Sequence, residues 1–234
     1  MSEKTPEQKK LDFEKFSKIG RSNVRKSKSF ERRVSDLLES ATGYEFRRRR
    51  SEGRDNKTIA INRTADVMCT GGDIKFSIEA KSGTKAEKFC LNALMNNSVN
   101  AQFTVWWHQA SYDAELLTKY ANNGLVYYPL LIFKYSLAAE WVAIPNELVA
   151  SGSVKFKDIP QHLVFDGYKN LNPISHNISK TKNKKNFKYH PLDLQAVFMT
   201  SWKQFAASIV PETLFYVLPE KSDSKENTRE EGTA

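Results

Sequence analysis

The segment Asp66-Val-Met-Cys-Thr-Gly-Gly-Asp-Ile-Lys-Phe-Ser-Ile-Glu-Ala-Lys81 carries the clearest structural pattern in the chain. Two runs rich in strand-forming residues, 64–70 and 73–81, flank the pair Gly71-Gly72. A two-glycine loop suits the primed turns that connect the strands of a hairpin. The segment is therefore predicted to form a β-hairpin.

The register of this hairpin separates apolar from charged side chains. With Val67 opposite Phe76, alternation along both strands gives one apolar face that packs on the core. The opposite face then gathers Asp66, Glu79 and Lys81, and a one-residue slip would break up this grouping. An ordinary solvated strand face carries similar charges, so the spacing alone leaves that alternative open.

Length and charge limit the class of protein. A chain of 234 residues can bury a full core, as one α/β domain with extensions. The net charge of +9 favours a polyanionic partner such as nucleic acid, although basic charge can also serve solubility. Cys69 and Cys90 are too few for a disulfide framework, so a cytoplasmic location is expected. The longest apolar stretch, 125–133, is too short to span a membrane, and no membrane partner is expected.

No motif in the sequence indicates ATP, dinucleotide or zinc chemistry. The chain has neither a G-x-x-x-x-G-K-[ST] run nor a G-x-G-x-x-G run. Its four histidines lack paired ligand spacing, and its two cysteines do not form a zinc pattern.

Upstream of the hairpin, the sequence predicts helices and a strand. Residues 29–42 have apolar side chains at helical spacing, and Gly43 suits the position just after a helix. Glu31 lies on the flank of the apolar stripe, so it is the acidic residue of this helix best placed to face the sheet. An ion pair with a neighbouring basic residue is its alternative role. A short helix is also expected at 6–19, and a strand is expected to begin at 44–46.

Two basic clusters are candidates for contacts with a phosphate backbone. Four consecutive arginines follow the strand at 44–46, and the guanidinium group is suited to bidentate phosphate contacts. A lysine cluster in the C-terminal third surrounds two aromatic residues. Solvated charged loops would look the same, which leaves both interpretations open. The candidate DNA contacts are Arg47, Arg48, Arg49, Arg50, Lys182, Lys184 and Lys185.

The remaining elements complete an α/β pattern. A helix is expected to begin near 106 or 108 and to end near 123, with a strand at 103–107 as the alternative. Other expected elements are a helix or loop at 87–97, strands at 130–134 and 140–144, a helix at 192–207 and a strand at 214–218. This order predicts a mixed central β-sheet flanked by helices. The expected domain plan is a basic arm at 1–27, a core at 28–148, an extension with a basic loop and a helix at 149–218, and a disordered tail at 219–234.

At this point the residues resemble a known family. Asp66 followed by Glu79-Ala80-Lys81, after a helix that contains Glu31, is similar to the motif of the PD-(D/E)xK nuclease superfamily. The layout is most similar to the Holliday-junction resolvase and phage endonuclease branch, over about residues 28–145, and implies a restriction-endonuclease-like core. The sequence departs from the motif at Ala65, where proline is common.

The resemblance implies a Mg²⁺ site, with Mn²⁺ as a substitute. Asp66, Glu79 and the backbone carbonyl of Ala80 would coordinate the metal, because a divalent cation held by carboxylates can activate water and neutralise phosphate charge. Lys81 would orient or deprotonate the attacking water, or stabilise the charge that develops on the phosphate. Deprotonation by Lys81 would require a locally lowered pKa.

Two further residues extend the expected site. Glu31 would hold a second metal ion or a metal-bound water, and Gln109 would fix Lys81 or the water through its amide, unless it has no catalytic duty. The expected function is a Mg²⁺-dependent DNA endonuclease of phage or mobile-element type with a resolvase-like core. The resemblance implies a homodimer, and a structure-specific substrate such as a Holliday junction is one option that the sequence leaves open. A sequence-specific restriction or homing endonuclease is one alternative, and a non-catalytic nucleic-acid-binding or assembly protein with this fold is another.

Overall fold

The computed structural model of the chain describes residues 6–49, 65–83, 102–121, 123–135, 138–165 and 196–218. Within the first helix, side chains are described for Gln8 and from Arg25 onward. The expected helix or loop at 87–97, the residues Arg50, Lys182, Lys184 and Lys185, and the tail at 219–234 lie outside the described residues.

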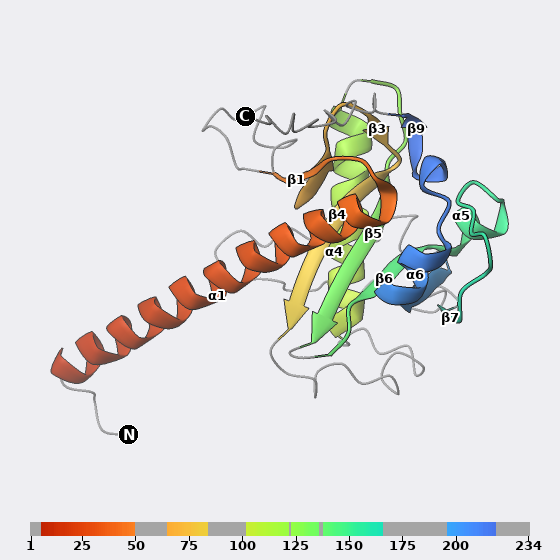
Figure 1. The fold of residues 1–234 in the computed structure, drawn as a ribbon. Helices are drawn as coiled ribbons and strands as arrows, with labels where there is room; N and C mark the ends of the chain where they lie inside the picture. The colour runs from red at the N-terminus through yellow and green to blue at the C-terminus, as the bar shows by residue number, and fades with distance from the viewer. Residues whose placement is uncertain are drawn as a thin grey trace, which may run out of the picture.

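The chain begins with one long helix, α1 (Pro6–Thr42), so the prediction of two separate helices is wrong. Most residues between the two predicted segments have ordinary helix propensity, and a single interior glycine opposes a helix by only about 1 kcal/mol. The C-terminal half of α1 packs on the sheet through Phe30, Val34 and Leu38, while its N-terminal half extends beyond the body of the protein (Figure 1). Gly43 ends the helix with a φ of 75° and donates its N–H to Glu39 O at 2.8 Å, which confirms the predicted helix end.

A mixed seven-stranded sheet forms the centre of the molecule, in the order β1-β2-β4-β5-β6-β8-β7. Strands β4 and β5 are parallel and are joined through helix α4, whereas the other neighbours are antiparallel. The predicted mixed α/β sheet is confirmed. The strands are β1 (Phe46–Arg48), β2 (Val67–Cys69), β4 (Phe76–Gly83), β5 (Tyr128–Tyr135), β6 (Trp141–Pro145), β7 (His162–Phe165) and β8 (Val197–Ser201).

The hairpin forms with a register that differs from the predicted one. Val67 lies opposite Ile78, two residues further along β4 than Phe76. The difference arises because Asp73 and Ile74 leave the central sheet and form β3 (Asp73–Ile74), which pairs with the C-terminal strand β9 (Phe215–Val217). Because the shift is two residues, the side chains of β2 and β4 keep their predicted faces.

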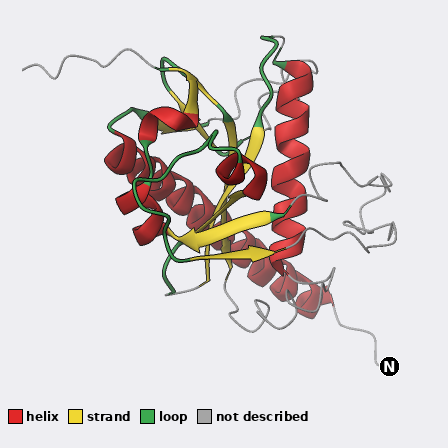
Figure 2. Ribbon diagram, turned by 90° about the vertical axis from the view of Figure 1, so that its right-hand side faces the viewer, coloured by secondary structure: helices red, strands yellow, loops and turns green. Residues whose placement is uncertain are grey.

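Helices cover both faces of the sheet (Figures 1 and 2). On one face, the apolar residues of α1 pack against Ile78 and Ile132. On the other face lies α4 (Gln102–Tyr120), whose Phe103 and Trp107 belong to a buried cluster with Phe133. Helix α4 begins earlier than expected, so the alternative of a strand at 103–107 is wrong; its aromatic residues serve the core instead.

The C-terminal region contributes to the same sheet. Residues 197–201, predicted as part of a helix, form strand β8, which pairs with β6 and β7. Helix α6 (Trp202–Ser208) begins only where the Ser201 hydroxyl accepts a hydrogen bond from Gln204 N–H. The predicted C-terminal strand is confirmed as β9 and follows a 3-10 helix, η3 (Pro211–Leu214). Helix α5 (Asn146–Ala150) connects β6 to the loop before β7. Among the described residues, no helix combines the length and apolar character needed to cross a membrane.

Candidate active site

Asp66 is fixed at the point where three strands meet. Its N–H donates to Ile78 O of β4 at 2.8 Å, and its carbonyl accepts the N–H of Arg49 at 2.9 Å. Its side-chain Oδ2 accepts the N–H of Ala80 at 3.0 Å. The carboxylate is therefore held against the edge of β4, beside the Glu79-Ala80-Lys81 motif.

The residue before Asp66 explains the departure from the superfamily motif. Ala65 is buried and has a φ of 70°, in the left-handed region that opposes an L side chain by about 1–2 kcal/mol. Proline cannot adopt this conformation, because its ring fixes φ near about −65°. A backbone that turns in this way to present Asp66 excludes the common motif residue.

Glu79 and Lys81 extend from β4 on the face covered by α4. The Glu79 residue is 2% exposed, and its Oε2 lies 2.7 Å from Lys81 Nζ in a largely buried ion pair. Asp66 lies beside them, since its own N–H is paired with Ile78 O on the same strand. The structure thus brings together the three charged residues that the sequence placed on one face.

Burial sets the protonation of this cluster. Burial, followed by the like charge of Glu79, raises the pKa of Asp66 to about 7. Burial also raises the pKa of Glu79 to about 7, although the charge of Lys81 acts against the shift. For Lys81, burial acts to lower the pKa, but the carboxylates of Glu79 and Asp66 outweigh it and the net shift is upward. Lys81 is therefore protonated in this state, and its expected role in deprotonating water stays a prediction.

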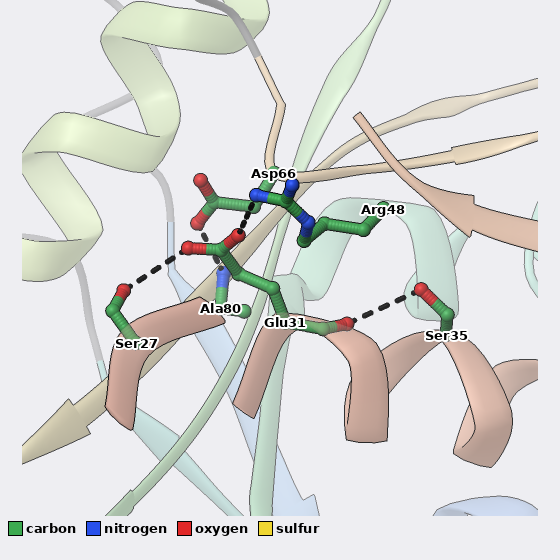
Figure 3. A network of polar contacts seen from close by, with 6 residues as sticks. All are labelled: Ser27, Glu31, Ser35, Arg48, Asp66 and Ala80. Atoms are coloured by element: carbon green, nitrogen blue, oxygen red, sulfur yellow. Dashed lines mark hydrogen bonds and ion pairs between the residues drawn. The ribbon is translucent and has the colours of Figure 1, made fainter. Parts of the chain in front are cut away.

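Glu31 reaches the site from α1 (Figure 3). Its Oε2 lies 3.2 Å from Arg48 Nη1 of β1, and its Oε1 accepts a hydrogen bond from Ser27 at 3.0 Å. Its charge is one of the causes of the raised pKa of Asp66, so the two carboxylates influence each other. Glu31 is thus both an acid of the cluster and the partner of an arginine.

Asp113 is a further candidate site residue, which the sequence analysis does not single out. It lies on α4 and hydrogen-bonds both Glu79 and Gln109 through its side chain. Its pKa is raised, first by burial. Gln109 therefore contacts the cluster through Asp113, and its expected contact with Lys81 or the water stays a prediction. The signal was present, because residues four apart share one face of a helix, so Gln109 marked the position of Asp113 as well.

The predicted arginine contacts have three different environments. Arg47 is exposed and pairs with Glu45 at 2.6 Å. Arg48 is mostly buried and faces the cluster through Glu31. Burial lowers the pKa of Arg49, whose backbone supports Asp66. Arg48 joins the cluster through its ion pair with Glu31.

The chemistry of the cluster fits a hard divalent cation. Asp66 and Glu79 supply carboxylate oxygens, and burial is the main cause of their raised pKa values, so a bound cation would favour their charged forms. The N–H of Ala80 points to Asp66, and the N–H and C=O of one strand residue point the same way, so its carbonyl faces this edge too. In the part of the chain that the structure describes, no three acidic, histidine or cysteine side chains are already grouped as a metal site.

Comparison with known proteins gives a single family assignment. Residues 22–215 match the family described as "Phage putative PDDEXK endonuclease". Searches of curated proteins and of solved structures gave no match. The matched range contains Glu31, Asp66 and the Glu79-Ala80-Lys81 motif, together with every described strand except the end of β9. The chain therefore belongs to this family of phage PD-(D/E)xK endonucleases.

Proposed function

We propose that the protein is a metal-dependent endonuclease that hydrolyses phosphodiester bonds of DNA. The observation that carries this proposal is the Asp66 carboxylate fixed at 3.0 Å from the backbone of Ala80, directly beside the Glu79–Lys81 ion pair. Membership of the endonuclease family supports the same reaction.

Each residue of the cluster has a different proposed role in hydrolysis. Asp66, Glu79 and the Ala80 carbonyl would hold Mg²⁺ or Mn²⁺, which when bound lowers the pKa of water and neutralises phosphate charge. The upward shift in the pKa of Lys81 favours its charged form, in which it would orient the attacking water or stabilise negative charge that develops on the phosphate. Asp113 holds Glu79 in place from α4. These contacts are made by strands and a helix of the core, which fix the groups before the substrate arrives.

Glu31 and Arg48 form the side of the cluster nearest α1. Arg48 carries a guanidinium group suited to a bidentate phosphate contact, and Glu31 holds it at the site in the absence of substrate. An incoming phosphate would compete with Glu31 for this guanidinium. Once Arg48 has bound the phosphate, Glu31 could hold a second metal ion or a metal-bound water, as the resemblance implies.

The substrate that we propose is branched DNA, cut by a homodimer. Symmetric cutting of two strands requires two active sites, which a closed twofold dimer provides. Light scattering of the purified protein would give its mass in solution. A monomer at all concentrations would contradict the dimer, and equal cutting of linear and four-way-junction DNA would contradict the preference for branches.

The test of the reaction itself is a cleavage assay on labelled linear, nicked, single-stranded and four-way-junction DNA, and on RNA. We expect cutting with Mg²⁺ or Mn²⁺ and none with EDTA. Asp66→Asn, Glu79→Gln and Lys81→Met should each reduce the rate at least about a hundredfold. Asp73→Asn, which changes an exposed aspartate on β3, is the matched control and should keep the wild-type rate.

Each contrary result identifies a different failure. Cutting by Glu79→Gln at the wild-type rate would contradict the site. Cutting of one duplex sequence only would favour a restriction or homing enzyme. DNA binding without cutting under every metal condition would favour a non-catalytic protein with this fold.

A further inference from the structure

Helix α1 carries a row of basic side chains that continues outward from the candidate active site. Beyond Glu31, toward the N-terminus, Arg25 and Lys28 are exposed, and Arg32 is exposed on the next turn. The backbone of α1 runs on past these residues to Pro6, away from the sheet (Figure 1). Helix α1 thus carries positive charge beside the candidate active site and on the turns that lead away from it toward the N-terminus.

Helix geometry places these three residues on one stripe. They are spaced three and four residues apart, and such residues lie above one another on an α-helix. The stripe lies away from Val34, which faces the core, and Glu31 lies on the flank between the two. We call Arg25, Lys28 and Arg32 the basic stripe of α1. It borders the same side of the helix from which Glu31 reaches Arg48.

Two other basic residues near the stripe have an acidic partner, which the stripe lacks among the described side chains. Arg33 is paired with Glu140 at 2.8 Å, and Lys134 lies 4.0 Å from the same glutamate. Among the described side chains, by contrast, none forms an ion pair with Arg25, Lys28 or Arg32. These three exposed cations, which no described side chain neutralises, are available to an external anion.

The spacing of the stripe suits a nucleic-acid backbone. From Arg25 to Arg32 the helix rises roughly 10 Å. Phosphates of one strand of duplex DNA rise about 3.4 Å per nucleotide along the axis, so the stripe spans roughly three phosphates. A single small anion would need only one of these side chains. A polyanion that lies along the helix would contact all three side chains, and one end of it would lie near Glu31 at the candidate active site.

We propose that the basic stripe of α1 binds the phosphate backbone of duplex DNA and guides the strand to be cut toward Asp66. This inference rests on the proposed DNA substrate. The contact is with the backbone, so it supplies affinity and orientation and no sequence preference.

The experiment measures binding separately from cutting. A fluorescent duplex of about 30 base pairs is titrated with the full-length protein in EDTA, over a series of salt concentrations. The stripe variant is R25Q/K28Q/R32Q. The matched control is K155Q/K157Q/K203Q, which removes the same charge from exposed lysines beside β7 and α6, across the sheet from β2. Circular dichroism melting checks that both variants fold.

We expect the stripe variant to bind at least about tenfold more weakly at low salt and to have a shallower salt dependence. The slope of log Kd against log salt should fall by about 0.9 for each lost phosphate contact, or about 2–3 in all. The control variant should bind with a Kd within about twofold of wild type. Its lysines lie away from the proposed contact, so their loss removes only long-range attraction between the protein and DNA.

Several results would overturn the inference. Equal binding by the stripe variant, equal losses in both variants, no DNA binding by wild type, or a stripe-dependent preference for RNA would each do so. Stripe-dependent binding of an acidic protein such as polyglutamate, without binding of DNA, would indicate a protein partner instead. If wild type binds DNA through the stripe but never cuts it with any metal, the proposed reaction fails while the stripe stands. If wild type cuts and the stripe variant binds normally, only the stripe fails.

Discussion

Strand β4 is buried on both of its faces, but the two faces have opposite chemistry. Toward α1 it presents Ile78 and Ala80, which pack among the apolar residues of the larger core cluster. Toward α4 it presents Ser77, Glu79 and Lys81, which are polar or charged. Neighbouring residues on one strand are therefore placed in an apolar core and in a charged cluster.

The difference shows that burial alone does not identify what stabilises the fold. Moving an apolar side chain out of water contributes about 25 cal/mol for each Å². Moving a carboxylate into the interior opposes folding unless the group is paired or protonated. The apolar face of β4 therefore stabilises the protein, whereas the buried carboxylates of the charged face oppose folding unless they are paired or protonated.

The largest change in the free energy of unfolding should come from a substitution on the apolar face of β4. Ile78 is 0% exposed at the centre of the core, and Ile78→Ala should lower the free energy of unfolding by about 2–5 kcal/mol. Urea denaturation followed by circular dichroism measures the change. Met68→Ala on β2 is the control, because Met68 is 43% exposed and should lose less than about 1 kcal/mol. A loss at Ile78 no larger than the loss at Met68 would refute the contrast.

On the charged face, removing a buried charge should raise the stability of the protein instead of lowering it. Burial raises the pKa of Asp66 to about 7 from an ordinary value near 3.8, so the folded state binds its proton more tightly than the unfolded chain does. Stability from this group is therefore present at low pH and is lost as pH rises from about 4 to about 7. Asp66→Asn should be more stable than wild type at pH 8, on the order of 2 kcal/mol, and the difference should close toward pH 4.

Thermal melting across this pH range tests the prediction, with Asp73→Asn as the exposed control. Adding Mn²⁺ at pH 8 should raise the melting temperature of wild type and leave Asp66→Asn nearly unchanged, since a ligand stabilises only the form that binds it. A variant that is less stable than wild type at pH 8 would show that Asp66 supports the fold.

The faces of β4 could be predicted from the sequence, but its register could not. Alternation fixes which side chains share a face, and it survives a shift of two residues. The true register depends on β3 leaving the sheet to pair with β9, about 140 residues later in the chain. A contact over that separation leaves no local pattern around Gly71-Gly72.

The parts of the site that the sequence missed also depend on tertiary structure. Asp113 reads as an ordinary helix residue until α4 is packed over Glu79. Arg48 looks like one of four equivalent arginines until β1 places it against Glu31. The apolar residues of 192–207 are available for burial on one helix, which predicts a helix there. Strand β8 instead lies between β6 and β7, where its first four residues are buried and show no polar alternation that would mark a strand.

A smaller effect is expected at the residue that presents Asp66 to the charged face. Ala65→Gly should stabilise the protein by about 1 kcal/mol, because glycine adopts a φ of 70° without opposition from a side chain. Ala65→Pro, which restores the common motif, should destabilise the protein and abolish cutting, because proline cannot adopt this φ. Melting temperature and cleavage rate measure both. A stable, active Ala65→Pro protein would show that the strand enters the site with a different backbone.

The smallest predicted change in stability comes from removing buried hydroxyl groups. It compares one hydroxyl that has a described hydrogen-bond partner with one that has none. Ser77 is completely buried on the charged face, and no described atom hydrogen-bonds its hydroxyl. Thr200 of β8 is equally buried, but its hydroxyl donates to Gln161 O at 2.7 Å. Since an unpaired buried hydroxyl opposes folding, Ser77→Ala should raise stability by up to about 1 kcal/mol, whereas Thr200→Val should lower it by about 1 kcal/mol. If urea denaturation shows equal losses for both, the Ser77 hydroxyl is bound in solution, and the polar side of β4 is better satisfied than its protein contacts indicate.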